Sequence, residues 1–384
     1  MWALALLLVA LASHAVLIAW LRSVIGKGPL RTSALVAAAI FLTIALYGPR
    51  ENFGYTSFEL AVVALGGGLF VTLLIGGRAV VFVRARRRMP VAAPEPAPAP
   101  AATAAEKTGR RQTFVRLAGG VSWAVSAGSL GWGSARTRHD FELVEVVVKV
   151  PGLPRSLEGY AIAQISDLHV GTFVGEEDLA AGLELVARAR PDLLVVTGDL
   201  IDFDAGLAPM VAARVAKLAP RDGVVGILGN HEYHSDPDAV RAALTAAKID
   251  VLVNESRVLR AGDGGGFVLL GLDDYSAVRM GGRGPDLAGT LAAAPMAGPR
   301  ILLAHQPQQF DEAAGSVALQ LSGHTHGFQF GFAASVGRIA RKYVSGRYEK
   351  KGSVLWVNRG LGVTGPPSRV GVRPEVTKIV LVAG

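Results

Sequence analysis

The apolar positions of this 384-residue chain follow one pattern before about residue 135 and another after it. Long, almost unbroken apolar stretches occupy residues 2–21, 33–47 and 60–77. The first has the length that a helix needs to cross a bilayer, and the glycines of the third suit close helix packing in lipid. The pattern therefore predicts a transmembrane region with three helices over residues 1–88.

Two segments separate this region from the rest of the chain. Residues 89–110 contain few large apolar side chains and are rich in Pro and Ala, which indicates an extended, semi-rigid linker. Residues 111–135 begin with arginine and continue as a weaker apolar run, so they are either a signal-like export segment or a fourth transmembrane helix. Both interpretations place the following domain outside the cytoplasm. A third, an amphipathic segment lying on the membrane surface, leaves that domain inside.

From residue 140 to the C-terminus, short apolar runs of strand length alternate with stretches of helical periodicity. The expected strands cover residues 142–150, 160–166, 193–197, 224–228, 301–304 and 319–322, and the expected helices cover residues 176–190, 208–219 and 237–248. This alternation predicts a folded domain of the α/β class over residues 140–384.

Charge divides the chain in the same way. Residues 1–140 carry 15 Lys and Arg against 5 Asp and Glu, a net charge of +10, while residues 141–384 carry 24 against 26, a net charge of −2. No nucleic-acid partner is expected, because the part that holds the candidate chemistry is nearly neutral. The cationic residues 84–88 mark a cytoplasmic end by the positive-inside rule, which predicts a multi-pass protein of the cell membrane with its C-terminal domain outside. Cysteine is absent, which excludes disulfides and thiolate chemistry.

Candidate chemistry lies where the predicted strands end. Five of these strands are followed by polar clusters that contain Asp167 and His169, Asp199 and Asp202, Asn230 and His231, His305, and finally His324 and His326. Five of the eight histidines of the chain fall in these positions. Since α/β sheets place their sites at the carboxyl ends of the strands, we expect these side chains to meet.

Seven of these residues are ligand types for metal ions, which is more than one cation needs. Two metal ions about 3.5–4 Å apart can share a bridging carboxylate and clamp the oxygens of a phosphoryl group. Asp199 is the natural bridge, and the glycines at positions 198, 229 and 323 would let the backbone approach the site closely. Nitrogen and oxygen ligands without thiolate favour Mn²⁺, Zn²⁺ or Fe over Mg²⁺.

The ordered set of motifs, from Asp167-x-His169 to Gly323-His324-x-His326, resembles the calcineurin-like metallophosphoesterases. The segments 357–362 and 374–376 are similar to their membrane-associated branch, which includes twin-arginine-type phosphodiesterases and UDP-2,3-diacylglucosamine pyrophosphatases. The resemblance implies a four-layer αββα sandwich. It places one metal ion on Asp167, His169, Asp199 and His326, and the other on Asp199, Asn230, His305 and His324. It also implies that His231 acts on the phosphate or leaving group and that Asp202 orients it.

The predicted function is hydrolysis of a phosphodiester or pyrophosphate by hydroxide generated on two divalent cations. The substrate could be lipid-linked, with acyl chains on a strand face formed by Phe328, Phe330 and Phe332, although these side chains could equally fill the core. Alternatives are a phosphomonoesterase or nucleotide phosphodiesterase acting on soluble substrates, and a non-catalytic membrane scaffold. His234 could contact substrate or lie free in a loop, and Arg359 could bind phosphate or form an ion pair. The oligomeric state is left open.

Overall fold

The structure is a computed structural model that describes residues 131–262, 265–329, 342–364 and 367–384, with positions 121, 125, 128 and 129. Trp132–Gly384 form one compact unit. The predicted transmembrane region 1–88 and linker 89–110 lie outside the described residues, as does most of segment 111–135. Within the described residues, no helix has both the length and the apolar character to span a bilayer.

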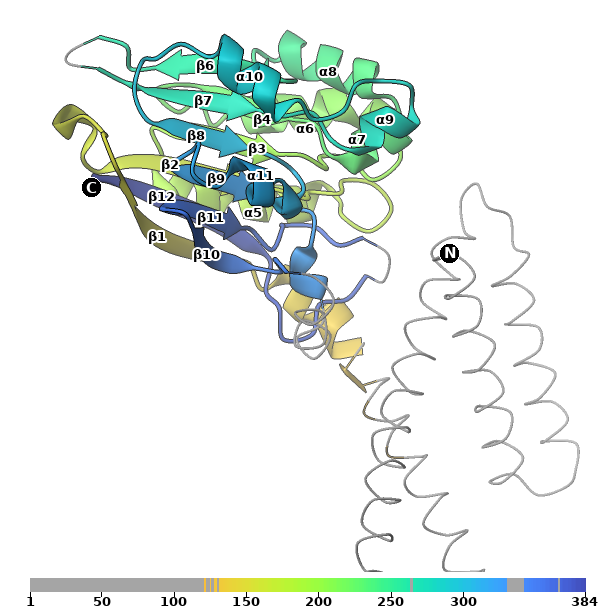
Figure 1. Ribbon diagram of the computed structural model, residues 1–384. Coiled ribbons are helices and arrows are strands. Elements are labelled where there is room, and N and C mark those ends of the chain that lie inside the picture. The colour runs from red at the N-terminus through yellow and green to blue at the C-terminus, as the bar shows by residue number, and fades with distance from the viewer. Residues whose placement is uncertain are drawn as a thin grey trace, which may run out of the picture. The chain divides into compact units, whose positions relative to one another are not determined.

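Two six-stranded mixed sheets form the centre of this unit (Figure 1). The first sheet has the spatial order β1 (Glu142–Val150), β12 (Glu375–Ala383), β2 (Tyr160–Ile165), β3 (Leu193–Thr197), β4 (Val224–Ile227) and β5 (Asp250–Val251). The second has the order β10 (Gly346–Lys350), β11 (Ser353–Val357), β9 (Leu319–Ser322), β8 (Arg300–Leu303), β7 (Phe267–Gly271) and β6 (Glu255–Leu259).

Within each sheet, the strands that lead to the candidate site run parallel to one another. β2, β3 and β4 pair in parallel in the first sheet, and β8 and β9 pair in parallel in the second. Their carboxyl ends therefore point the same way within each sheet. The predicted α/β class and all six predicted strands are confirmed.

Helices cover the outer faces of both sheets. Residues 131–135 are helical, and the further helices in the described residues are α5 (Glu176–Ala189), α6 (Ala208–Ala216), α7 (Asn230–His234), α8 (Pro237–Ala246), α9 (Ser276–Arg279), α10 (Leu287–Ala293) and α11 (Phe310–Ala313). Those predicted at 176–190, 208–219 and 237–248 are confirmed, each ending one to three residues earlier than expected.

Side-chain alternation along the strands contributes to four buried apolar clusters among the described residues. In β3, Leu194 and Val196 pack with residues of α5, α6 and α8, whereas Leu193 and Val195 face the second sheet. A third cluster joins β7 and β8 to α10 and α11. Because both faces of β3 are covered, its sequence is a continuous apolar run rather than an alternating one. The order of layers is helix, sheet, sheet, helix, as the αββα expectation requires.

Candidate metal centre

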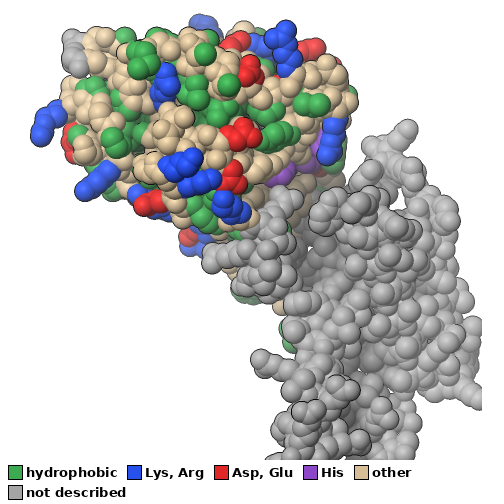
Figure 2. Space-filling view, in the orientation of Figure 1, with side chains coloured by type: hydrophobic (Ala, Val, Ile, Leu, Met, Phe, Trp, Pro, Cys, Tyr) green, Lys and Arg blue, Asp and Glu red, His purple; other side chains and the backbone are tan. Residues whose placement is uncertain are grey.

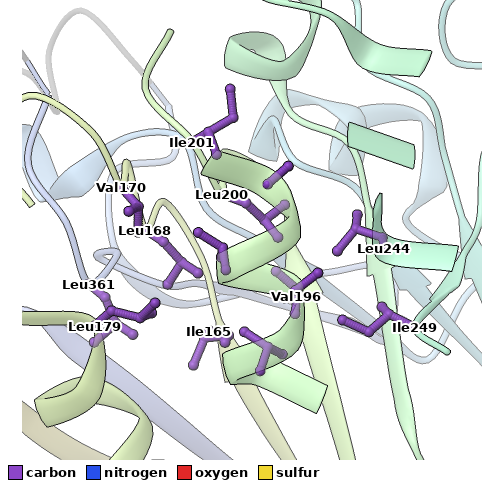
Figure 3. Close-up of a cluster of buried hydrophobic side chains, with 14 of the residues drawn as sticks. Ile165, Leu168, Val170, Leu179, Val196, Leu200, Ile201, Leu244, Ile249 and Leu361 are labelled. Carbon is purple, nitrogen blue, oxygen red and sulfur yellow. The ribbon is translucent and has the colours of Figure 1, made fainter. Parts of the chain in front are cut away.

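The candidate residues come together at the carboxyl ends of five strands drawn from both sheets. β2, β3 and β4 lead to Asp167, Asp199 and Asn230, while β8 and β9 lead to His305 and His324. Apolar residues that alternate with the candidate ligands anchor these loops in the hydrophobic core. Leu168 and Leu200 point into the buried cluster under the first sheet, next to Leu179 and Val196 (Figure 3).

Five of the seven predicted metal ligands have a left-handed backbone. Their φ angles are 52° at Asp167, 46° at His169, 54° at Asp199, 71° at His324 and 51° at His326. Residues other than glycine rarely adopt such angles, and they persist only where surrounding packing enforces them. The chain thus turns sharply as it leaves β2, β3 and β9. This turn lets Asp167 and His169 both face the site.

Glycines bring the backbone against the ligands, as predicted. A Cβ atom on Gly229 would lie 2.3 Å from the Asp199 Oδ1 atom, and one on Gly323 would lie 2.2 Å from the Asp167 Oδ2 atom. Side chains cannot be accommodated at these distances without moving a ligand.

The first group of ligand atoms gathers around His169. Its Nε2 atom lies 3.0 Å from His326 Nε2 and 3.5 Å from Asp199 Oδ2, and His326 Nε2 lies 3.4 Å from Asp167 Oδ1. Asp167 and His169 are at most 1% exposed. Asp167, His169 and His326 offer ligand atoms close enough to one another to hold one ion.

The second group lies on the other side of Asp199. The His305 Nε2 atom lies 3.2 Å from Asp199 Oδ2 and 3.1 Å from Asn230 Oδ1, and His324 Nδ1 lies 2.8 Å from the same Asn230 oxygen. Asp199, His305 and His324 meet the spacing for one ion. The Oδ2 atom of Asp199 therefore faces both groups. Its Oδ1 atom accepts a hydrogen bond of 2.9 Å from the backbone N–H of His231.

His231 lies beside these groups at the start of α7. Its Nδ1 atom lies 2.7 Å from the backbone carbonyl of Asp202 and 3.4 Å from the Asp202 Oδ1 atom. Since a carbonyl only accepts, Nδ1 carries a proton. Hence the backbone of Asp202 orients His231 more closely than its carboxylate does. His169, Asp199 and His231 also meet the spacing for an ion, so the assignment of His231 to the substrate stays a prediction.

Electrostatics link these imidazoles to the buried carboxylates. Burial lowers the pKa of His231, but the carboxylates of Asp199 and Asp202 outweigh it and raise that pKa to about 9. Burial raises the pKa of Asp202, but the imidazoles of His169 and His231 hold it at about 2. Burial also lowers the pKa of His305, yet the charge of Asp199 raises it well above its usual range.

The donor set fits divalent cations. Asp167 and Asp199 are buried, and within the described residues neither forms an ion pair with a Lys or Arg side chain. Their ion-pair partners are imidazoles. Buried carboxylates without a cation are costly, and a metal ion offsets that cost. His169 Nδ1 and Asp202 Oδ1 have no hydrogen-bond partner and lie 3.7 Å apart, the arrangement in which a carboxylate supports a metal-binding imidazole.

Glu232 connects two loops of the candidate site, a role that the sequence did not reveal. It is fully buried, and its carboxylate accepts backbone N–H bonds from Gly229 at 2.7 Å, Asp199 at 2.9 Å and Leu200 at 2.7 Å. One side chain therefore holds the loop after β3 against the loop after β4. The sequence signal for this role is the position of Glu232 as the third residue of α7, because a carboxylate there can accept hydrogen bonds from the N–H groups that precede the helix.

A loop from the C-terminal part of the chain closes the site from another side. The N–H groups of Leu361 and Gly362 donate to the carbonyls of Ser166 at 3.0 Å and Asp167 at 2.7 Å. Arg369, fully buried, donates to the carbonyls of Arg359 and Gly362 in this loop. Sequence reasoning missed this arginine, because nothing local marks it as buried.

The remaining candidates fall outside the cluster. Arg359 forms ion pairs with Glu142 and Glu375, which favours the packing alternative. His234 is exposed, and its ring centre lies 5.6 Å from that of His231. Phe328 belongs to the 3₁₀ turn η5 (His326–Phe328), with a φ of 62°, so its assignment to a strand face is wrong. Phe330 and Phe332 lie outside the described residues.

Comparisons with known proteins give the site a family context. A model of the calcineurin-like phosphoesterases matches residues 160–328. An uncharacterised metallophosphoesterase of Bacillus subtilis, YkuE, is 33% identical over 290 residues, which cover 72% of this chain and 98% of that relative. One from Aquifex aeolicus is 32% identical over 240 residues, covering 62% and 90%. A Danio rerio protein named transmembrane protein with metallophosphoesterase domain is 32% identical over 249 residues, covering 62% of this chain but only 57% of its own length.

Proposed function

The chain belongs to the calcineurin-like phosphoesterases, metal-dependent hydrolases of phosphate esters, and on this premise we propose that it binds two divalent cations and hydrolyses a phosphodiester or pyrophosphate. One observation carries the proposal. The Asp199 Oδ2 atom lies 3.5 Å from His169 Nε2 and 3.2 Å from His305 Nε2, between two groups of ligand atoms. A carboxylate in this position suits a bridge between two cations.

One cation would be held by Asp167, His169 and His326. The other would be held by Asn230, His305 and His324, and Asp199 would be shared by both cations. Bound divalent cations supply positive charge for the phosphoryl oxygens and activate a water molecule for attack. The mixed nitrogen and oxygen donors favour Mn²⁺, Zn²⁺ or Fe.

His231 is the proposed acid for the leaving oxygen. The Asp202 carbonyl binds its Nδ1–H, which leaves Nε2 as the position that exchanges a proton with substrate. The hydrogen bonds and charge of Asp202 raise the pKa of His231, which favours the protonated ring that proton donation requires.

The proposal extends to location and substrate class. The apolar stretches within residues 1–88 would anchor the chain in the cell membrane, with the domain 140–384 outside, and a relative carries the word transmembrane in its name. A domain tethered at a bilayer gains direct access to lipid-linked phosphodiesters or pyrophosphates, whereas a soluble nucleotide gains nothing from tethering. A non-catalytic scaffold is disfavoured because none of the seven ligand-type residues has been lost.

The test combines metal analysis with a substrate panel on the full chain purified in detergent. We expect two metal ions per chain and turnover of bis(p-nitrophenyl) phosphate or an acylated nucleoside pyrophosphate that exceeds turnover of p-nitrophenyl phosphate. One metal ion per chain would overturn the binuclear centre, and preference for the monoester would support the phosphomonoesterase alternative. A reporter fused after Gly384 that is active only in the cytoplasm tests the topology, because its activity would contradict an outside domain.

A further inference from the structure

Exposed apolar side chains concentrate beside the candidate metal centre. From residue 140 onward, seven large apolar side chains among the described residues are exposed, and four of them come from two segments next to His231. These are Phe203, 55% exposed, Tyr275, 38%, Val278, 57%, and Met280, 63%. The other three, Leu143, Val147 and Met296, belong to β1 and the loop after α10.

Both segments lie next to the short helix that carries His231. The Phe203 ring centre lies 5.1 Å from that of His231, and the Phe203 carbonyl accepts a hydrogen bond from Ser235 at the end of α7. α9, which carries Val278 and Arg279, also packs against α7. Figure 1 shows α7 and α9 next to each other, and Figure 2 shows histidine atoms reaching the surface there.

Two arginines add positive charge to the same segment. Arg279 and Arg283 are exposed, and neither forms an ion pair with any acidic side chain that the structure describes. Half of the exposed arginines among the described residues are paired instead, for example Arg214 with Glu176 and Arg241 with Glu255. We call Phe203, Tyr275, Val278, Arg279, Met280 and Arg283 the site-mouth surface.

We propose that the site-mouth surface docks onto a bilayer that contains anionic lipids, so that the phosphate group of a membrane lipid enters the metal centre past His231. Exposed Val and Met can enter the interface, Tyr suits the headgroup level, and unpaired arginines attract anionic headgroups. The apolar stretches within residues 1–88, proposed above as a membrane anchor, would hold the domain near a bilayer. This inference rests on the proposed function, since it names the form in which the substrate reaches the site.

The absence of cysteine from the chain makes a direct test possible. Met280→Cys places one label in the site-mouth surface, and Met296→Cys is the matched control at another exposed methionine. The full chain, purified in detergent, is labelled with a fluorophore, mixed with phosphatidylglycerol, phosphatidylcholine and a nitroxide lipid, and freed of detergent. We expect the lipid nitroxide to quench the label at 280 at least threefold more than the label at 296.

Charge reversal then tests the recognition. Arg279→Glu with Arg283→Glu should reduce the quenching at 280 to the level at 296, because each arginine near an anionic surface contributes about fivefold to the docking equilibrium. Arg155→Glu, an exposed arginine before β2 and so at the opposite end of that strand from the site, should change nothing. Pure phosphatidylcholine should weaken the quenching as the double reversal does.

Three outcomes would overturn the proposal: equal quenching at 280 and 296, no quenching at either, or a label at 280 that is shielded from both lipid nitroxide and aqueous iodide. The last result would indicate a protein partner instead. Hydrolysis of bis(p-nitrophenyl) phosphate is measured in the same samples. Turnover without docking contradicts the membrane-docking proposal but not the proposed function. Docking without turnover contradicts the proposed function but not the docking.

Discussion

The two sheets contribute different chemistry to one site. The first sheet supplies both buried carboxylates, the Asn230 amide, His169 and the proposed acid His231. The second supplies only imidazoles, from His305, His324 and His326. The anionic charge of the candidate centre therefore resides on the first sheet, and the second sheet would complete the proposed coordination sphere with imidazoles.

Hydrogen bonds between the sheets hold the two halves in register. The His324 backbone N–H donates to the Asp167 carboxylate at 2.9 Å, and His305 Nδ1 binds the Thr197 carbonyl at 2.8 Å. Gln164 in β2 donates to the Ser322 carbonyl in β9 at 3.0 Å. Substitutions on the first sheet should therefore change both the charge and the geometry of the candidate metal centre. The positions of the imidazoles from the second sheet depend mainly on how the two sheets pack together.

The largest effect is expected when the shared anion is removed. Asp199→Asn removes the charge that faces both groups of ligands, so kcat/KM for bis(p-nitrophenyl) phosphate should fall by about 10³-fold or more, with loss of at least one metal ion per chain. Asp204→Asn, an exposed carboxylate five residues later, is the control. Turnover near that of the unchanged protein with two metal ions still bound would contradict the binuclear assignment.

The second effect separates proton transfer from metal binding within the first sheet. His231→Ala should retain both metal ions yet lower kcat by about 10²–10⁴-fold, because only the proton donor is lost. The loss should be smallest for a nitrophenol leaving group, which departs without a proton. Equal losses for nitrophenol and alkyl leaving groups, or loss of a metal ion, would assign His231 a different role.

Much of this site could be predicted from the sequence, since each polar cluster directly follows an apolar run of strand length. The strand Leu193–Thr197 and the position of Asp199 after it can be predicted from the local sequence. Features that depend on contacts between distant parts of the chain cannot. β12 inserts between β1 and β2, and the positive φ angles of Asp167 and His326 are imposed by surrounding contacts rather than by residue type.

A third prediction tests how the loops of the first sheet are held. Glu232→Gln keeps the size of the side chain but turns an NH₂ group toward N–H donors, so metal affinity should fall by about 10–100-fold and the melting temperature of the metal-free protein should drop. Calorimetric titration with Mn²⁺ measures the affinity. Glu255→Gln, at an exposed ion pair with Arg241, should leave both unchanged. Unaltered metal affinity would show that Glu232 only stabilises the fold.

The smallest effect concerns the Asp202 carboxylate, whose backbone carbonyl already orients His231. Asp202→Asn keeps that carbonyl and removes a charge that raises the pKa of His231, so kcat at neutral pH should fall only about threefold to tenfold. The pH profile carries the sharper test. A proton donor is active below its pKa, so activity should decline as pH rises through the pKa of His231, and the substitution should move that decline to lower pH.

Stability of the metal-free protein should respond with the same sign. A histidine pKa raised from 6.5 to about 9 by folding contributes stability that is complete below 6.5 and is lost as pH rises through 9. In the Asn variant this loss should be complete at a lower pH, because only the pKa of His231 in the folded protein is lowered. Thermal unfolding between pH 6 and about 10 measures it, with Asp204→Asn again as the control. A decline of activity at the same pH in both proteins would mean that the carbonyl alone, and not the carboxylate, sets the state of His231.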